Sequence, residues 1–205
     1  VTEQKVQDRQ RETLLDISHA INTASQLEDL CTEAVRVIAQ RYELPPQNVL
    51  LYFHRPADDQ LILLAPEIPL TDLQKNLYAF SIAHRADFAS VEAFTSGSKI
   101  VTTDLSRSVL YSFAPEKVIT TDVTTLVSLP LRIEKEKLGV LEILLHNSKD
   151  LVEKELSFLS LLASEITVGI SRRGLIDELR VKNVDLEIQR AQTAEAHEKL
   201  KRFLA

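Results

Sequence analysis

The residues of this chain that could carry out chemistry are few, and they lie far apart in the sequence. Histidine occurs at positions 19, 54, 84, 146 and 197, and no two of these have the spacing of a metal-binding pair. A haem needs only one axial histidine from the protein, so His54 and His84 stay open as haem ligands. The chain has no Ser-His-Asp signature, no His-Glu-x-x-His motif and no phosphate-binding loop.

One histidine stands in a suggestive pair, His197-Glu198. Histidine kinases present their phosphoacceptor as a His-Glu pair on a helix, followed shortly by a proline or a similar helix breaker. Here the chain continues instead with Lys-Leu-Lys-Arg over 199–202, and no ATP-binding segment follows within the 205 residues. We therefore interpret His197 as a helix surface residue, and a histidine kinase fragment is the catalytic alternative.

Isolated acids and the single cysteine have simpler interpretations. Asp87, Asp104 and Asp122 could act as a general acid or base, but such residues in loop-rich stretches are usually caps and turn formers. Asp104, before Leu-Ser, fits an N-cap or an Asx turn. Cys31 falls on the apolar face of an expected helix, where a small hydrophobic residue is usual. These observations predict a domain that is not an enzyme.

Composition limits the partners and the compartment. The net charge is -6, and Lys and Arg alternate with Asp and Glu, so neither nucleic acid nor an anionic membrane is an expected partner. No apolar run has the length of a membrane span, which excludes membrane insertion for the chain as given. One cysteine cannot form an intrachain disulfide, and together with the polar first ten residues this predicts a cytoplasmic protein.

The spacing of apolar residues predicts the elements that position these side chains. Helices are expected at 27–42, 71–83 and 87–97, the last with Gly97 as its stop. Strands are expected at 48–54, 60–65, 99–102, 126–131 and 138–145, and a charged turn at 134–137 joins the last two. Pro130 favours an edge strand or a bulge, because proline cannot donate to the ladder. A long helix opens near Leu151.

The order of these elements resembles a GAF domain. An apolar strand with a proline near its end, a short turn, Leu-Gly-Val-Leu-Glu-Ile and a helix of the Glu-Leu-x-Phe-Leu-x-Leu-Leu-Ala kind resemble the C-terminal half of that family. Residues 93–108, AFTSGSKIVTTDLSRS, resemble the family segment in which a helix ends, a short strand follows and an Asp-Leu pair opens the next loop. The resemblance covers roughly residues 10–175 and implies an α+β fold. Its central antiparallel sheet would have helices packed on the face opposite a ligand cleft, with long terminal helices; a PAS-like fold is the alternative.

The resemblance implies a regulatory sensor for a small molecule, with segment 66–125 covering the cleft. Because side chains alternate along a strand, only one of Tyr52 and Phe53 can face the cleft, and we choose Phe53. The Asn-Lys-x-Phe type motif of the cyclic-nucleotide-binding members is absent, so the ligand stays unidentified. Cys31 does not match the family's bilin attachment positions, so no covalently attached cofactor is expected. The candidate ligand-binding residues are Leu51, Phe53, Phe88, Asp104, Tyr111 and Ser128.

A heptad pattern in the last helix predicts a dimer. With Ile176 as an a position, Asn183 is also at a, and leucines fall at three of the four d positions. A buried asparagine at an a position favours a two-stranded parallel pairing. A solvated helix with charge pairs four residues apart is the alternative. The candidate interface residues are Ile176, Leu179, Asn183, Leu186 and Leu200.

Together these patterns predict three parts: a signalling or dimerisation helix at 1–25, a GAF-like sensor domain at 26–174 and a coiled-coil linker at 175–205. The expected function is that of a homodimeric regulatory domain, which passes its ligand state through the terminal helices to a covalently linked output domain. A ligand-free dimerisation module is the alternative from a different class, alongside the kinase fragment.

Overall fold

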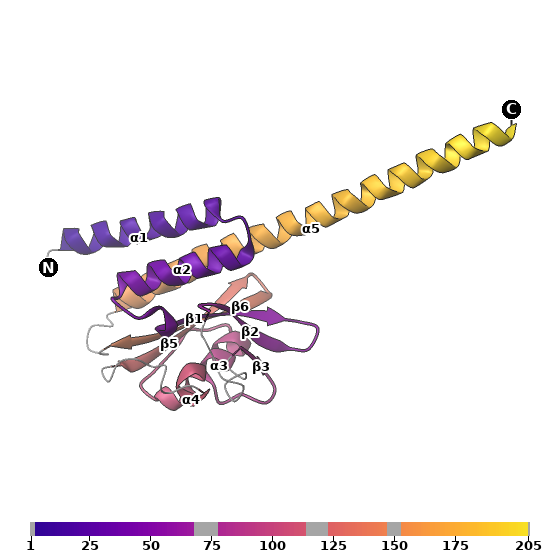
Figure 1. Ribbon diagram of the computed structural model, residues 1–205. Helices are drawn as coiled ribbons and strands as arrows, with labels where there is room; N and C mark the ends of the chain where they lie inside the picture. The colour runs from indigo at the N-terminus through magenta and orange to yellow at the C-terminus, as the bar shows by residue number, and fades with distance from the viewer. Residues whose placement is uncertain (1–2, 68–77, 114–122, 147–152, 205) are drawn as a thin grey trace. The chain divides into compact units, whose positions relative to one another are not determined.

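A computed structural model describes residues 3–67, 78–113, 123–146 and 153–204 of this chain (Figure 1). The chain divides into two compact units, Val1–Ile170 and Ser171–Ala205. The sheet and nearly all helices belong to the first unit. The second unit is the continuation of the last helix.

The first unit is built on a six-stranded antiparallel sheet with the strand order β3-β2-β1-β6-β5-β4. Both predicted hairpins are present, and the sheet confirms the expected α+β class. The strands coincide with apolar runs in the sequence. In some runs apolar residues alternate with polar ones and one face of the strand is buried; in others the run is continuous and both faces are buried. The strands are β1 (Val49–Arg55), β2 (Gln60–Ala65), β3 (Ala79–Ser81), β4 (Ile100–Thr102), β5 (Val123–Ile133) and β6 (Glu136–His146).

Helices cover the two faces of this sheet unequally (Figure 1). Helix α2 (Leu27–Arg41) and the first turns of α5 (Glu153–Leu204) lie on one face, as expected, and α1 (Glu3–Thr23) packs against them on the side away from the sheet (Figure 1). Two short helices, α3 (Ala89–Ser96) and α4 (Val109–Phe113), lie on the other face and form its cover. Short 3-10 turns, η1 (Pro46–Asn48) and η3 (Leu105–Arg107), precede β1 and α4. Gly97 ends α3 with a left-handed φ of 69°, as its predicted stop.

The sheet therefore separates two hydrophobic cores. The first core joins α1, α2 and α5 to side chains such as Leu51, Leu141 and Ile143. The second core joins α3 and α4 to the alternate side chains of the same strands, among them Tyr52 and Val140. Successive residues of a strand point to opposite faces, so each central strand contributes to both cores.

Two expectations about local structure need correction. Residues 79–81 form strand β3 and not the end of a helix over 71–83; residues 71–77 lie outside the described part. Pro130 lies in β5, which is not an edge strand of the sheet, although the predicted alternative, a bulge, agrees with the shift in the β5–β6 register between Leu131 and Arg132. However, β4 pairs with β5 only as far as Ser128, so the side of β5 that faces β4 has no partner strand at Pro130. Toward β4 no ladder hydrogen bond is required at this residue, which explains why a proline is tolerated here although it pairs with Val140 of β6 on the other side.

Helix α1 fits closely against α5 at a glycine. A methyl group added at Gly169 would lie 2.7 Å from the Cγ1 atom of Ile21. Real side-chain contacts are longer than this, so the absence of a side chain at position 169 sets the separation of the two helices. A small residue here brings the last turns of α1 into the first core.

A polar contact joins three helices at the other end of the same layer. The Glu155 carboxylate of α5 accepts hydrogen bonds from Tyr42 Oη at 2.7 Å, from Arg41 Nη2 at 3.2 Å and from Gln10 Nε2 at 3.4 Å. The Arg41 and Glu155 side chains are only 16% and 19% exposed. A charge pair so far removed from water is costly to break, because the remaining partner keeps a buried, uncompensated charge.

We expect Glu155→Ala to lower the free energy of unfolding by about 2 kcal/mol, because Arg41 and Tyr42 lose their acceptor. The matched control is Glu153→Ala, which removes another acid from the first turn of α5. Glu153 pairs with Lys99 at 3.3 Å, but its side chain is 79% exposed, so we expect a loss under about 0.5 kcal/mol. Urea denaturation followed by circular dichroism measures the free energy of unfolding of both variants. Equal losses of this free energy in the two variants would contradict the role given to Glu155.

Candidate functional site

The second core contains a buried carboxylate, Glu142, in the middle of strand β6. Its side chain has no exposed surface. In the sequence it interrupts an otherwise apolar strand, Leu138 to Leu145, apart from Gly139. Acidic side chains are almost never fully buried unless they are paired or functional, so this residue requires a specific explanation.

One oxygen of Glu142 holds the start of the cover helix α4. Oε1 accepts hydrogen bonds from Ser108 Oγ at 2.6 Å and from the backbone N–H of Val109 at 3.2 Å. Ser108 and Val109 lie where α4 begins, and the first N–H groups of a helix have no partner within the helix. The sheet and its cover are thus tied together by the carboxyl group of Glu142.

Further polar side chains surround Glu142 on the same face of the sheet. Ser128 of β5 lies directly opposite Glu142 in the β5–β6 ladder, and Tyr52 of β1 is near enough for the carboxylate charge to act on it. Ser90 of α3 approaches from the cover side and favours the ionised carboxylate, although its geometry falls short of a regular hydrogen bond. All are buried. We refer to Tyr52, Ser90, Ser108, Ser128 and Glu142 as the Glu142 cluster.

Burial shifts the pKa values of two side chains in this cluster. Desolvation raises the pKa of Glu142 to about 7, and the hydrogen bonds from Ser108 and Val109 oppose that shift. Burial also raises the pKa of Tyr52 well above its usual value, and the nearby Glu142 charge adds to the effect. The carboxyl group can therefore change its charge near neutral pH, whereas the tyrosine stays a neutral phenol.

Aromatic rings adjoin the cluster. Tyr52 meets Phe80 edge-on with ring centroids 5.2 Å apart, and Phe80 meets Phe88 edge-on at 5.6 Å. These rings connect β1, β3 and the residue that precedes α3. The site thus combines one carboxylate and several hydroxyls with an apolar, aromatic wall, the usual composition of a small-molecule site.

The residues predicted from the sequence fall in three different places. Phe88 and Ser128 are buried on the second-core face, together with the Glu142 cluster. Leu51 and Phe53 contact the first core, on the opposite face, so they cannot line the same cleft; the residue of the pair that faces the cover is Tyr52. This corrects the choice of Phe53.

The remaining two candidates lie nearer to the surface. Tyr111 of α4 is 41% exposed. Asp104 caps η3, where its carboxylate accepts a 3.1 Å hydrogen bond from Ser106 N, so the predicted cap or turn is confirmed. Sequence reasoning missed Glu142, Ser90 and Ser108. The signal for Glu142 was a lone acid within an apolar strand.

The other residues with potential chemistry do not join this cluster. His54 lies 3.0 Å from Asp59 through its Nε2 atom, at the hairpin that joins β1 and β2, and His84 is exposed. No group of three potential metal ligands occurs among the described residues. Within the same residues, no helix has the length and apolar character needed to cross a membrane.

Cys31 is buried in the first core, across the sheet from Glu142, and burial raises its pKa to about 12. Only the thiolate reacts readily, so we expect Cys31 in the folded protein to be labelled by a thiol reagent such as DTNB at least 100-fold more slowly than a free thiol. A Ser98→Cys variant supplies an exposed cysteine in the same protein as a control. Rapid labelling of Cys31 without denaturant would contradict this prediction.

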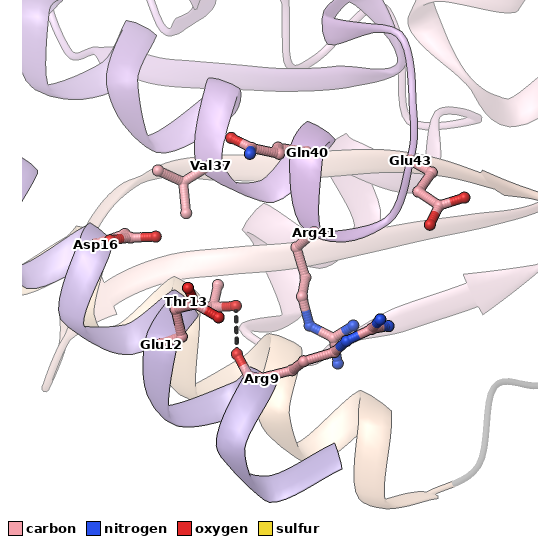
Figure 2. Close-up of a pocket in the computed structure, with 8 residues that line it drawn as sticks. All are labelled: Arg9, Glu12, Thr13, Asp16, Val37, Gln40, Arg41 and Glu43. Carbon is pink, nitrogen blue, oxygen red and sulfur yellow. Dashed lines mark hydrogen bonds between the residues drawn. The ribbon is translucent and has the colours of Figure 1, made fainter. Parts of the chain in front are cut away.

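A separate pocket of about 280 Å³ lies between α1 and α2 (Figure 2). Its walls carry charges of both signs, and the Thr13 hydroxyl already donates to the Arg9 carbonyl oxygen at 2.8 Å. It is an open polar groove between two helices and shares no residue with the Glu142 cluster. Its lining consists of Arg9, Glu12, Thr13, Asp16, Val37, Gln40, Arg41 and Glu43.

Comparison with known proteins identifies the family. A sequence model of the GAF domain matches residues 24–171. The chain belongs to the GAF domain family. Members of this family are ligand-sensing regulatory domains, and the expected resemblance is confirmed. A search of curated protein sequences found no matching relative.

Solved structures confirm the GAF fold at low sequence identity. The GAF domain of a phosphoenolpyruvate-protein phosphotransferase from Coxiella burnetii is 19% identical, with a TM-score of 0.64 over 83% of this chain and 97% of that one. The phycoerythrobilin-bound GAF domain of a cyanobacterial phytochrome is 17% identical, with a TM-score of 0.58 over 82% and 97%.

A third similar structure corrects one expectation. Free methionine-R-sulfoxide reductase from Neisseria meningitidis, solved in complex with its substrate, is 15% identical, with a TM-score of 0.60 over 82% of this chain and 91% of that one. An enzyme therefore shares this GAF fold. The prediction that the domain is not an enzyme is therefore wrong: this fold supports catalysis as well as sensing, so the lack of a familiar catalytic motif does not exclude an enzyme.

Proposed function

We propose that this GAF domain senses a small molecule that binds at the Glu142 cluster, beneath the cover formed by α3 and α4. The observation that carries the proposal is the set of buried, partly unsatisfied polar side chains against an aromatic wall on this face of the sheet. Proteins rarely bury such a set without a use for it, because each unsatisfied group costs stability.

The link from Glu142 to the start of α4 suggests how binding is reported. A ligand that competes for the carboxylate changes the acceptor of Ser108 and Val109, and so changes the position of α4. The ligand can shift this equilibrium only by the difference in its affinity for the two arrangements. We propose that the change reaches a covalently linked output domain through the terminal helices.

Native mass spectrometry of the purified protein tests the sensor proposal, first under gentle and then under activating conditions. We expect a discrete excess mass that is released on activation and is lost in Ser128→Val, which fills the cluster. The control is Thr125→Val, which changes a buried residue paired with Leu145 of the first core. A clean chain mass in every sample, with no stabilising compound in a metabolite screen, would favour the ligand-free dimerisation module.

We also propose that the second unit mediates a parallel homodimer. The proposal rests on the heptad pattern of Ile176, Leu179, Asn183, Leu186 and Leu200. Ile176 is partly buried within the single chain, and the side chains of the other four lie outside the described part. Sedimentation equilibrium of Leu179→Lys/Leu186→Lys should give a monomer where the parent protein is a dimer. A parent protein that is monomeric at every concentration would rule out this interface.

A further inference from the structure

Four polar atoms of the Glu142 cluster have no hydrogen-bond partner among the residues that the structure describes: Tyr52 Oη, Ser90 Oγ, Ser128 Oγ and Glu142 Oε2. They come from three strands and one helix, and the residues that carry them are completely buried. Tyr52 Oη and Ser128 Oγ lost water on folding and gained no hydrogen bond in return, and Ser90 approaches Glu142 without reaching regular hydrogen-bond geometry. Their shared location points to one missing group that would satisfy several of them at once.

Oε2 of ionised Glu142 can only accept a hydrogen bond, whereas the hydroxyls of Tyr52, Ser90 and Ser128 can each donate or accept one. A ligand group that satisfies Oε2 is therefore a donor. An anion would be repelled by the ionised carboxylate, and a carbonyl group has no hydrogen to donate to Oε2. A neutral hydroxyl supplies one donor, whereas the cluster offers several acceptors around one negative charge.

The hydrogen bonds already made by Glu142 decide between two cationic groups. A guanidinium binds a carboxylate best through two parallel hydrogen bonds, one to each oxygen. Here Oε1 is occupied by Ser108 and Val109, and only Oε2 remains. A primary ammonium is compact, carries three donors that point in different directions, and needs only one carboxylate oxygen.

We propose that the Glu142 cluster binds the primary ammonium group of a small ligand, with Glu142 as the counter-ion and the hydroxyls of Tyr52, Ser90 and Ser128 as further acceptors. This inference rests on the proposed sensor function and specifies the ligand as a small amine. The apolar part of the ligand would lie against Phe80 and Phe88, whose rings adjoin the cluster.

The test compares n-propylammonium with n-propanol and propionate, which have similar size but present a neutral donor or an anion. Protein labelled with ¹³C at the glutamate carboxyl carbons gives a direct readout, and the Glu142 signal is assigned by its disappearance in Glu142→Gln. We expect propylammonium to shift this signal with saturation and to raise the melting temperature. The alcohol and the acid should do neither at equal concentration.

Variants connect the binding to the cluster. Glu142→Gln keeps the size and one acceptor oxygen but removes the charge, and we expect at least a tenfold weaker affinity for propylammonium. Ser128→Ala should weaken it several-fold, and Thr125→Val, on the opposite face, should leave it unchanged. Equal affinity of Glu142→Gln and the parent protein, or equal binding of the alcohol and the amine, would overturn the inference.

The sensor function and the ammonium assignment can fail separately. A released mass that proves to be a neutral or acidic compound, together with no response to propylammonium, overturns the ammonium assignment and leaves the sensor function standing. If no mass is released and propylammonium produces no response, both the sensor function and the ammonium assignment are overturned. A saturable amine response that depends on Glu142 supports the assignment even where the purified protein carries no ligand.

Discussion

Gly139→Ala is expected to remove about 4 kcal/mol or more from the free energy of unfolding, a large share of the stability of a typical domain. Gly139 lies in β6, directly opposite Phe53 of the neighbouring central strand β1. A methyl group at this position would overlap the carbonyl oxygen of Tyr52 and lie 3.0 Å from its carbonyl carbon and 3.1 Å from Phe53 Cα. These are backbone atoms, so they cannot rotate away as a side chain would.

The overlap can be relieved only by separating β1 from β6, which are both central strands. Their separation would open both cores at once, because each strand contributes side chains to both faces. Urea denaturation followed by circular dichroism measures the loss where the variant folds. Where it does not fold, the two-dimensional NMR spectrum collapses to the narrow amide range of an unfolded chain.

Gly174→Ala is the matched control for this substitution. Gly174 lies within α5, and a methyl group there would meet no atom within 4 Å. Alanine is favoured over glycine in a helix by about 1 kcal/mol, so the control should be neutral or slightly stabilising. Similar losses in the two variants would show that the close approach of β1 and β6 is not the cause.

Glu142→Gln is expected to change how stability depends on pH. The pKa of Glu142 is about 7 in the folded protein, above its ordinary value of 4.5. The folded state therefore binds the proton more tightly than the unfolded state, and the parent protein is most stable below pH 4.5 with respect to this group. Its contribution falls as the pH rises from 4.5 to 7 and is constant above that range.

At 1.36 kcal/mol per pKa unit, the whole effect is about 3 kcal/mol. Glutamine does not ionise, but its amide oxygen can still accept from Ser108 and Val109. The stability of Glu142→Gln relative to the parent protein should therefore increase by about 2–3 kcal/mol between pH 5 and pH 8.

Urea denaturation in a series of buffers measures this difference. The control is Glu136→Gln, which changes an exposed residue of the same strand and should give a difference that does not depend on pH. A difference for Glu142→Gln that stays constant from pH 5 to pH 8 would show that the carboxyl group has no raised pKa in the folded protein.

The sequence predicted the secondary structure well where local signals are strong. Gly97 marked the end of α3 because a left-handed residue terminates a helix, and the charged turn at 134–137 marked the β5–β6 hairpin because those residues are too polar to bury. The error at 79–81 arose where only three residues form the strand. So short a segment carries too few residues for a period of two to be told from a helical period.

The candidate site was predicted less well, for a physical reason. Alternation along β1 indicates that Leu51 and Phe53 share one face and that Tyr52 shares the other, but not which face meets which helices. Both faces of β1 are buried over Val49 to Tyr52, so the usual contrast between apolar and polar positions is missing. The choice of Phe53 over Tyr52 had no local signal to guide it.

Long-range contacts account for the rest of the site. Ser108 and Glu142 are 34 residues apart, and only the packing of α4 on the sheet brings them within 2.6 Å. A serine at the start of a short helix and an acid within a strand each have ordinary local interpretations. Their pairing becomes visible only when the cover and the sheet are seen together.

The two-sided sheet has a consequence for how sequences of this kind can diverge. Along β6, Val140, Glu142 and Leu144 face the α3–α4 cover, and Leu141, Ile143 and Leu145 face the three long helices. If the proposed sensor site is correct, substitutions at every second position can alter recognition while the intervening residues preserve the scaffold. A mutational scan of this strand under selection for ligand response should show two interleaved patterns of tolerance, one dictated by chemistry and the other by packing volume.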